Sequence, residues 1–194
     1  MTLLLAKIVW FIGVAAWYVI RRPYARRARK TATVLRTDRR REQVLLGGAF
    51  FGLFIVPLVY VLTDQPEFAS YAPIPAQIIL GALVFAGSLW LFVRAHKELG
   101  RQWSASLEIR EKHALVRSGI YRHVRHPMYT SFWLWALAQA ILLPNLIAGP
   151  IGLVSVGFLY FMRIGREEQM MLEAFGDDYR AYMAQTKRIV PGIY

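Results

Sequence analysis

Five apolar segments separated by charged loops dominate this chain of 194 residues. The segments cover residues 3–20, 44–62, 74–93, 128–143 and 146–162. A helix that crosses a bilayer needs about 20 mostly apolar residues, with a range of about 17–25, and the first three segments meet this requirement. The last two are shorter and are separated by Pro144-Asn145, a pair typical of turns. We therefore expect an all-α, polytopic membrane bundle of five transmembrane helices, the last two of which form a short helical hairpin.

Nearly all basic residues fall on one side of this predicted topology. Three segments hold 23 of the 24 Lys and Arg residues, namely 21–43, 94–127 and 163–194. With five spans, these segments share a side, and the positive-inside rule makes that side cytoplasmic. The C-terminus is then cytoplasmic and helical, while the N-terminus, residues 63–73 and the Pro144-Asn145 turn lie outside. The first segment has no basic leader, and arginines follow it where a cleavage site would stand, so we interpret it as a retained helix.

The composition excludes several classes of protein. The chain is 56% hydrophobic with a net charge of +12. A soluble nucleic-acid-binding protein would explain the charge but not the apolar content, and we find no motif of that class. We therefore expect membrane lipids, and no nucleic acid, as partners. The chain has no cysteine and only four histidines, which excludes thiolate sites, and no H-E-x-x-H pattern is present, so we expect no metal.

All four histidines lie in the predicted cytoplasmic segment 94–127. Pro127 directly precedes the fourth apolar segment, and proline is common at the first position of a helix. His126 is then placed near a helix N-terminus, where backbone N–H groups and the helix dipole favour an anion. Gly119 supplies the backbone freedom for a turn. This segment predicts a pocket at the membrane surface for a ligand that carries a carboxylate or a phosphate.

A second group of charged residues follows the last apolar segment. Arg163 and Glu167 are one helical turn apart and share a face, whereas Glu168 is rotated away from Arg163. The spacing is also typical of a salt bridge at a helix end. Residues 173–182 alternate acidic and aromatic side chains around Gly176, which predicts an amphipathic helix with a break at the glycine.

Both groups resemble motifs of a known family. The run H-x-L-V-x-x-G-x-Y-x-x-x-R-H-P-x-Y, over residues 113–129, resembles the signature of the isoprenylcysteine carboxyl methyltransferase family of integral-membrane enzymes. The tail R-x-x-x-E-E…F-G-x-x-Y-x-x-Y…R-x-x-P, over residues 163–191, resembles the C-terminal motif of the same family. The resemblance covers about the C-terminal half of the chain and is strongest to small prokaryotic members. The sequence departs from the family at Ile120, where many members have proline.

The resemblance implies a single integral-membrane methyltransferase domain over residues 1–194, with three N-terminal spans in 1–93 and the cofactor-binding and catalytic part in 94–194. It implies S-adenosylmethionine as cofactor and S-adenosylhomocysteine as product. The matching cofactor-binding positions are His113, Ala114, Leu115, Val116, Tyr121, His126, Pro127, Met128 and Tyr129. Arg163 and Glu167 match the positions that face the acceptor. The implied acceptor is the carboxylate of a C-terminal prenylated cysteine, or a similar lipidic carboxylate, which enters from the bilayer between helices.

The chemistry of such an acceptor agrees with these residues. A carboxylate is already ionised at pH 7, so its methylation needs docking of the anion and no general base. The fork of Arg163 matches a carboxylate, and we expect Glu167 to orient Arg163 or to bind the amide of the substrate. Three alternatives remain open: a phospholipid N-methyltransferase, in which Glu167 would act as a base; an NADPH-dependent sterol-type reductase; and a non-enzymatic membrane subunit. The sequence does not specify the oligomeric state.

Overall fold

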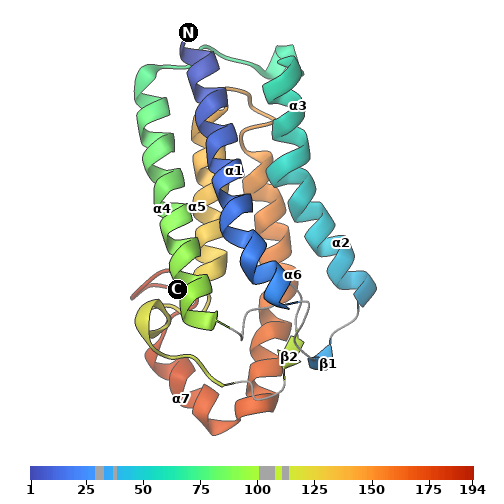
Figure 1. Cartoon of the computed structure of the whole chain (residues 1–194), viewed down its shortest axis with the longest axis vertical. Helices are drawn as coiled ribbons and strands as arrows, with labels where there is room; N and C mark the ends of the chain where they lie inside the picture. Colours follow the sequence, from blue (N-terminus) through green and yellow to red (C-terminus); the bar gives the residue numbers. More distant parts are fainter. Residues whose placement is uncertain (29–32, 37–38, 101–107, 111–113) are drawn as a thin grey trace.

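Long helices that run side by side form most of the molecule, and a smaller region that contains α7 and the two short strands lies at one end of them (Figure 1). The computed structural model describes residues 1–28, 33–36, 39–100, 108–110 and 114–194. The helices are α1 (Thr2–Ala28), α2 (Arg39–Phe50), α3 (Val56–Thr63), α4 (Pro75–Leu99), α5 (Pro127–Leu142), α6 (Ile151–Phe175) and α7 (Asp177–Gln185). Two short strands, β1 (Thr33–Arg36) and β2 (Glu108–Arg110), pair antiparallel. The helical fold class is confirmed, and the small sheet is an addition that the sequence pattern did not predict.

Three helical stretches are long and apolar enough to cross a membrane within the described residues. They are Thr2–Ala28, Arg40–Thr63 and Pro75–Leu99, and they match the first three predicted spans. Helix α5 has only 16 residues, and the second half of α6 carries charged side chains, so the fourth and fifth spans stay predictions. The first basic segment is partly helical rather than a loop, because α1 continues as far as Ala28.

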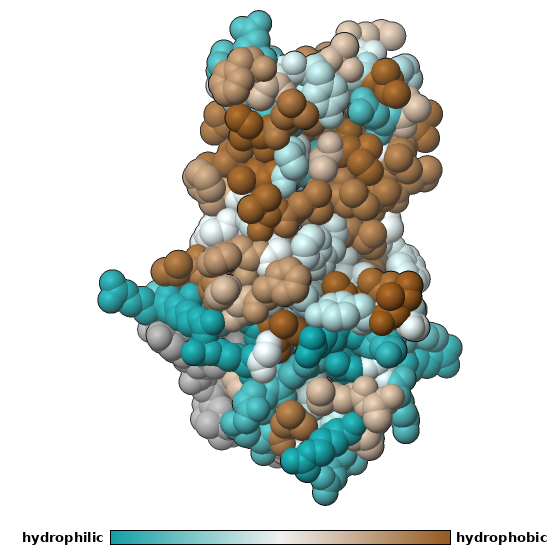
Figure 2. Space-filling model, turned by 180° about the vertical axis from the view of Figure 1, so that it is seen from behind, coloured by the Kyte–Doolittle hydropathy of each residue, from teal (hydrophilic) through white to brown (hydrophobic). Residues whose placement is uncertain are grey.

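The surface of the molecule is divided in the same way. Figure 2 shows apolar side chains over the bundle end that carries the N-terminus and hydrophilic side chains over the end that carries α7 and the sheet. Large apolar residues on the outside of the bundle, such as Val19, Leu83 and Phe161, are about two-thirds exposed. Such an apolar band is what a lipid-facing surface requires, because water-exposed patches of this extent are rare in soluble monomers. The band and the three apolar helices make this an integral membrane protein.

The predicted hairpin turn is fixed by a buried asparagine. The Asn145 side-chain oxygen accepts hydrogen bonds from the Ile147 and Ala148 N–H groups, and its Nδ2 donates to the Pro66 carbonyl. The Leu146 N–H donates to the Ala69 carbonyl at 2.8 Å. The turn and the loop after α3 therefore lie at the same end of the bundle, as the charge distribution predicted.

The second apolar stretch contains a π-helical segment, Phe51–Ile55, between α2 and α3. The Val56 N–H donates to the Phe51 carbonyl, in the i→i+5 pattern. In that pattern the next carbonyl, that of Gly52, would meet Pro57, which has no N–H. The Gln139 side chain of α5 donates to the Gly52 carbonyl instead, at 3.1 Å. A buried side-chain amide thus completes the irregular backbone and joins two helices.

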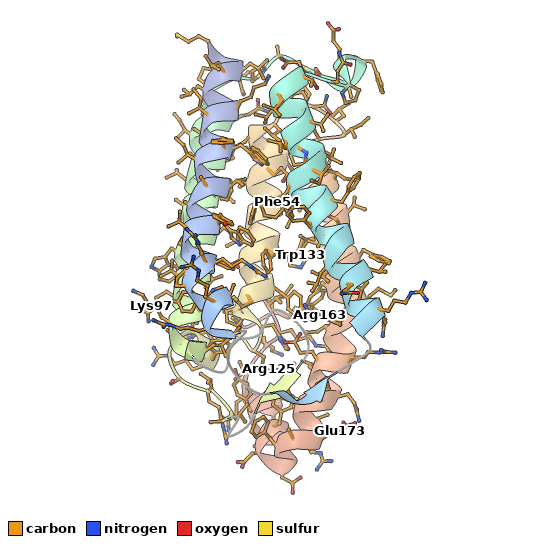
Figure 3. The ribbon with its side chains drawn as sticks, turned by 45° about the vertical axis from the view of Figure 1, so that its right-hand side comes forward. Phe54, Lys97, Arg125, Trp133, Arg163 and Glu173 are labelled. Atoms are coloured by element: carbon orange, nitrogen blue, oxygen red, sulfur yellow. The ribbon has the colours of Figure 1, made fainter. Side chains whose placement is uncertain are left out.

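An aromatic core fills the bundle above the polar end. Trp135 of α5 contacts Trp17, Phe54 and Phe85, with ring centroids 4.9–5.5 Å apart. Phe54 and Trp133 lie at mid-height between the helices, and Arg125 and Arg163 lie below them (Figure 3). The predicted break after the last long helix is confirmed at Gly176, whose φ of +52° favours glycine. The resulting turn directs α7 back toward the start of α5.

Candidate active site

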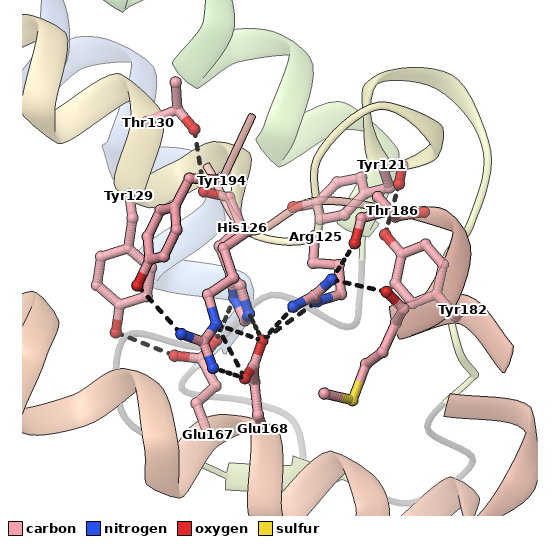
Figure 4. Close-up of polar contacts among 12 residues, drawn as sticks. Tyr121, Arg125, His126, Tyr129, Thr130, Glu167, Glu168, Tyr182, Thr186 and Tyr194 are labelled. Atoms are coloured by element: carbon pink, nitrogen blue, oxygen red, sulfur yellow. Dashed lines mark hydrogen bonds and ion pairs between the residues drawn. The ribbon is translucent and has the colours of Figure 1, made fainter. Parts of the chain in front are cut away.

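A buried carboxylate, Glu168 of α6, is the centre of a charged cluster at the polar end of the bundle (Figure 4). Arg125 and Arg188 each place an Nη2 atom 2.8 Å from a Glu168 oxygen. His126 Nε2 lies 3.4 Å from the same carboxylate. Burial alone would raise the pKa of Glu168, but the bonds from His126, Arg188 and Arg125 outweigh burial and hold that pKa well below its usual range. The carboxylate therefore stays charged at neutral pH.

The C-terminal tail brings one of these arginines to the cluster. The Arg125 N–H donates to the Lys187 carbonyl, and the His126 N–H donates to the Arg188 carbonyl, at 2.8 and 2.9 Å. Thr130 Oγ1 adds a bond to the Ile189 carbonyl at 2.8 Å. These bonds join residues 187–189 to the segment that opens α5, so that Arg188 faces Glu168.

His126 lies between two acidic side chains. It is the residue before Pro127, which starts α5 as predicted. Its Nδ1 is 3.6 Å from Glu167 and its Nε2 is 3.4 Å from Glu168. Burial lowers the pKa of His126, but the bonds and charges of the two glutamates outweigh burial, and the net shift is upward. His126 therefore binds a proton more readily than an ordinary histidine.

Arg163 is buried and forms an ion pair with a residue that no motif contains. Its Nη2 lies 3.0 Å from an oxygen of Glu42 in α2, and both side chains are about one-tenth exposed. We predicted that Glu167 orients Arg163 or binds the amide of the substrate. The charge of Glu167 does act on Arg163, and the role stays a prediction. Glu167 also accepts a hydrogen bond from the Tyr129 hydroxyl at 3.0 Å and lies near His126. Arg163 gains the additional carboxylate of Glu42 because α2 packs on α6.

The structure brings together part of the predicted cofactor site. His126, Pro127, Met128 and Tyr129 open α5 beside Glu167. Tyr121 is buried in the turn Gly119–Arg122, and its carbonyl accepts a hydrogen bond from the Tyr182 hydroxyl of α7.

The other predicted cofactor residues precede this turn. Ala114 is exposed, and Leu115 and Val116 are half-buried, in a stretch without regular secondary structure. His113 lies outside the described residues. The turn itself is held from α4, because the Ile120 N–H donates to Glu98 at 2.7 Å.

Sequence reasoning missed four charged residues, three in the Glu168 cluster and Glu42 beside Arg163. Arg125, Glu168 and Arg188 stand inside the two motifs, and the charge of each was a signal that could have identified them. Glu42 carries no such signal, because it lies far from the motifs in the sequence. Among the described residues, no group of three or more His, Asp or Glu side chains could hold a metal ion.

A groove opens between α2 and α6. It has a volume of about 390 Å³ and is lined by Arg40, Arg41, Val44, Leu45, Phe158 and Met162. Arg41 of this lining donates to the Met162 carbonyl at 2.8 Å. Val44 and Phe158 are more than half exposed on its apolar wall. The groove therefore opens on the lipid-facing surface, and its lining includes Arg41 and Met162, which precede Glu42 and Arg163 in the sequence.

Comparison with known proteins gives one consistent result. Residues 78–173 match the sequence model of the isoprenylcysteine carboxyl methyltransferase family. The chain is 32% identical over 91 residues to the protein-S-isoprenylcysteine O-methyltransferase of Dictyostelium discoideum and 35% identical over 79 residues to that of Schizosaccharomyces pombe. These matches cover 45% and 41% of this chain but only 37% and 34% of the relatives. The chain thus aligns with about a third of the length of either relative.

Two further matches extend over most of the chain. A probable protein-S-isoprenylcysteine O-methyltransferase of Oryza sativa subsp. indica is 27% identical over 97% of this chain and 94% of its own length. A solved structure of a eukaryotic intramembrane isoprenylcysteine carboxyl methyltransferase shares the fold with a TM-score of 0.53, at 24% identity, over 81% of this chain and 54% of that chain. The motifs, the family match and these similarities agree, and the matched part of the chain, residues 78–173, belongs to the isoprenylcysteine carboxyl methyltransferase family.

Proposed function

We propose that this protein transfers a methyl group from S-adenosylmethionine to the carboxylate of a prenylated C-terminal cysteine or a similar lipidic carboxylate. The observation that carries this proposal is the position of Arg163. It is a buried arginine beside Glu167 and Tyr129, next to a groove that opens on the lipid-facing surface. The name shared by the curated relatives supports the same reaction.

The acceptor would be docked rather than activated. An ionised carboxylate needs no base, and catalysis depends on holding it in line with the methyl group that the bound cofactor supplies. A guanidinium binds a carboxylate through two parallel hydrogen bonds, which makes Arg163 the docking residue. The isoprenoid chain would lie in the groove between α2 and α6, where Leu45, Phe158 and Met162 offer apolar contacts.

The cofactor would be held by the predicted residues near the start of α5. The Tyr121 hydroxyl is buried without a hydrogen-bond partner in the described part of the chain. Such a group is costly unless a ligand satisfies it, and the polar groups of S-adenosylmethionine would do so. Leu115 and Val116 would contact apolar parts of the cofactor, and His126, whose pKa is raised, would contribute a polar side chain beside it.

The state of Glu167 favours a carboxylate acceptor over an amine. Burial raises the pKa of Glu167, but the bond from His126, the charges of His126 and Arg163 and the bond from Tyr129 outweigh burial and lower it. A carboxylate whose pKa is lowered is a weaker base. A phospholipid N-methyltransferase would need Glu167 to accept a proton, so this arrangement supports the O-methyltransferase.

The proposed topology follows the charges. Five spans would place the Glu168 cluster and the C-terminus in the cytoplasm and the N-terminus outside. Residues 94–194 would form the cofactor-binding and catalytic part of a single domain. Residues 1–93 would supply the other spans and, through Glu42, one side chain of the site.

Methyl transfer in a defined bilayer tests the proposal. The protein in lipid nanodiscs would receive radiolabelled S-adenosylmethionine with either S-farnesylcysteine or phosphatidylethanolamine. We expect base-labile, volatile radioactivity with farnesylcysteine, because a methyl ester releases methanol in base. Stable label on phosphatidylethanolamine alone would replace the proposal by the N-methyltransferase. Calorimetric binding of NADPH, without binding of S-adenosylhomocysteine, would replace it by the reductase, and binding of neither would leave a non-enzymatic protein.

Two variants test the assigned residues. Arg163→Ala should raise the KM for farnesylcysteine and lower kcat, while the affinity for S-adenosylhomocysteine stays at the wild-type value. His126→Ala should weaken S-adenosylhomocysteine binding. Lost cofactor binding in Arg163→Ala, or unchanged cofactor binding in His126→Ala, would contradict the corresponding role.

A further inference from the structure

Two successive residues at the start of α2 bind α6 beside the proposed acceptor site. Arg41 donates from Nη2 to the Met162 carbonyl at 2.8 Å, and Glu42 lies 3.0 Å from Arg163 Nη2. Met162 and Arg163 are also successive, so the two contacts are adjacent on both helices. Leu45 and Ala49, one and two turns after Glu42, pack on Leu159 and Ile164 and continue the interface into the membrane. The start of α2 is therefore anchored to α6 where Arg163 begins the polar half of that helix.

Arg163 has a second acidic neighbour on its own helix. Glu167 is one turn further along α6, on the same face, and its negative charge acts on Arg163. Glu167 is engaged by the Tyr129 hydroxyl and lies near His126. The ion pair with Glu42 pulls the guanidinium toward α2. Without Glu42, the charge of Glu167 would still act on Arg163, and an arginine that moved onto Glu167 would leave its present position.

The burial of both partners makes this contact sensitive to change. The side chains of Arg163 and Glu42 are 10% and 9% exposed. A buried guanidinium that loses its counter-charge is strongly destabilised and turns to another anion. Gln at position 42 would keep the size and one oxygen acceptor but not the charge. The position of Arg163 thus depends on the charge of Glu42 as well as on its shape.

We propose that Glu42 is a positioning residue, which holds the Arg163 guanidinium between α2 and the Glu167–Tyr129 pair in the orientation that docks the acceptor carboxylate. This inference rests on the proposed function, because it assigns Arg163 to the acceptor. Glu42 has no contact with the acceptor in this role and acts only through Arg163. It lies outside both sequence motifs, in the N-terminal part of the chain.

Variants of the full-length protein in nanodiscs test the inference by two measurements. The first is calorimetric binding of S-farnesylcysteine and of its methyl ester, and the second is methyl transfer at varied acceptor and fixed saturating cofactor. Glu42→Gln should weaken farnesylcysteine binding and raise its KM about tenfold, the size of one charge-assisted hydrogen bond. Binding of the methyl ester and of S-adenosylhomocysteine should not change. Glu42→Asp keeps the charge with a shorter reach and should fall between wild type and Glu42→Gln.

A matched control is Glu173→Gln, which makes the same chemical change at an exposed position of α6. It should match wild type in both measurements. Thermal unfolding of each variant shows that it is folded, and Glu42→Gln is the variant of choice because it preserves volume.

The outcomes separate this inference from the proposed function. If the wild-type protein binds farnesylcysteine but does not methylate it, the proposed reaction is refuted. In that case, weaker binding of farnesylcysteine by Glu42→Gln would still support the inference. If the wild-type protein methylates farnesylcysteine and Glu42→Gln changes neither the KM for farnesylcysteine nor its binding, the inference is overturned and the proposed function stands. A lower KM in Glu42→Gln would also overturn it, because Glu42 would then compete with the acceptor for Arg163. Wild-type protein that does not bind the carboxylate would overturn both.

Discussion

Replacing Glu168 by Gln removes the negative charge on which Arg125, Arg188 and His126 converge. Gln has nearly the same volume and keeps one oxygen acceptor, so the change acts through charge rather than packing. The side chain of Arg125 is 7% exposed and that of Glu168 is 6% exposed, whereas that of Arg188 is 33% exposed. Arg125 cannot recover the lost interaction from water, and Arg188 can do so in part.

The expected magnitude follows from this difference in burial. Breaking a buried ion pair by removing one partner costs about 3–5 kcal/mol, and a partly solvated pair such as that of Arg188 adds up to about 1 kcal/mol. A chain of this size loses about 2–4 °C in Tm for each kcal/mol. We therefore expect Glu168→Gln to cost about 3–6 kcal/mol and to lower the Tm by about 6–24 °C.

A double-mutant cycle measures the interaction itself. Thermal unfolding in one detergent would be followed by intrinsic fluorescence for wild type, Glu168→Gln, Arg125→Gln and the double variant. The cycle subtracts the other bonds that Arg125 makes, to the Met183 and Thr186 carbonyls. We expect a coupling of at least about 2 kcal/mol, and Glu173→Gln should unfold at the wild-type temperature. A Tm within about 2 °C of wild type, or strictly additive effects, would refute the view of Glu168 as the centre of the cluster.

Three further predictions concern the bundle and the response to pH. Gln139→Leu removes the amide that donates to the Gly52, Ala148 and Gly149 carbonyls. It should lower the free energy of unfolding by about 1–3 kcal/mol. A variant that unfolds at the wild-type Tm would show that other groups satisfy these carbonyls. Gly52→Ala places a Cβ 2.1 Å from Ser155 Oγ and 2.6 Å from its Cβ, which should cost about 1–3 kcal/mol and should be relieved by adding Ser155→Gly. The raised pKa of His126 means that its stabilising contribution is complete below the unfolded pKa of about 6.5 and disappears as pH rises through the folded pKa. The Tm of wild type should therefore fall over that interval more than the Tm of His126→Gln, and parallel curves would contradict the assignment.

Local patterns in the sequence predicted the features that depend on near neighbours in the chain. The three long apolar stretches became helices because length and composition alone satisfy a span. Pro127 started α5, and Gly176 ended α6 with a positive φ, because those residues restrict or release the backbone where they stand. Arg163, Glu167, His126 and Tyr129 were predicted as site residues because their types and spacing match a family motif, and the structure places them near one another.

The partners of these residues were decided by the tertiary structure. Helical periodicity put Arg163 and Glu167 on one face, but it could not show that α2 would bring Glu42 to the arginine. In the same way, Glu168 gained Arg125 from the segment before α5 and Arg188 from the C-terminal tail. Periodicity and motif spacing describe one element at a time, whereas the energy of a buried charge depends on which other elements surround it. The sequence by itself therefore determined the three long apolar helices, the segregation of charge and the motif residues proposed for the site, while the packing of α2 and of the tail against α6 decided which charges pair.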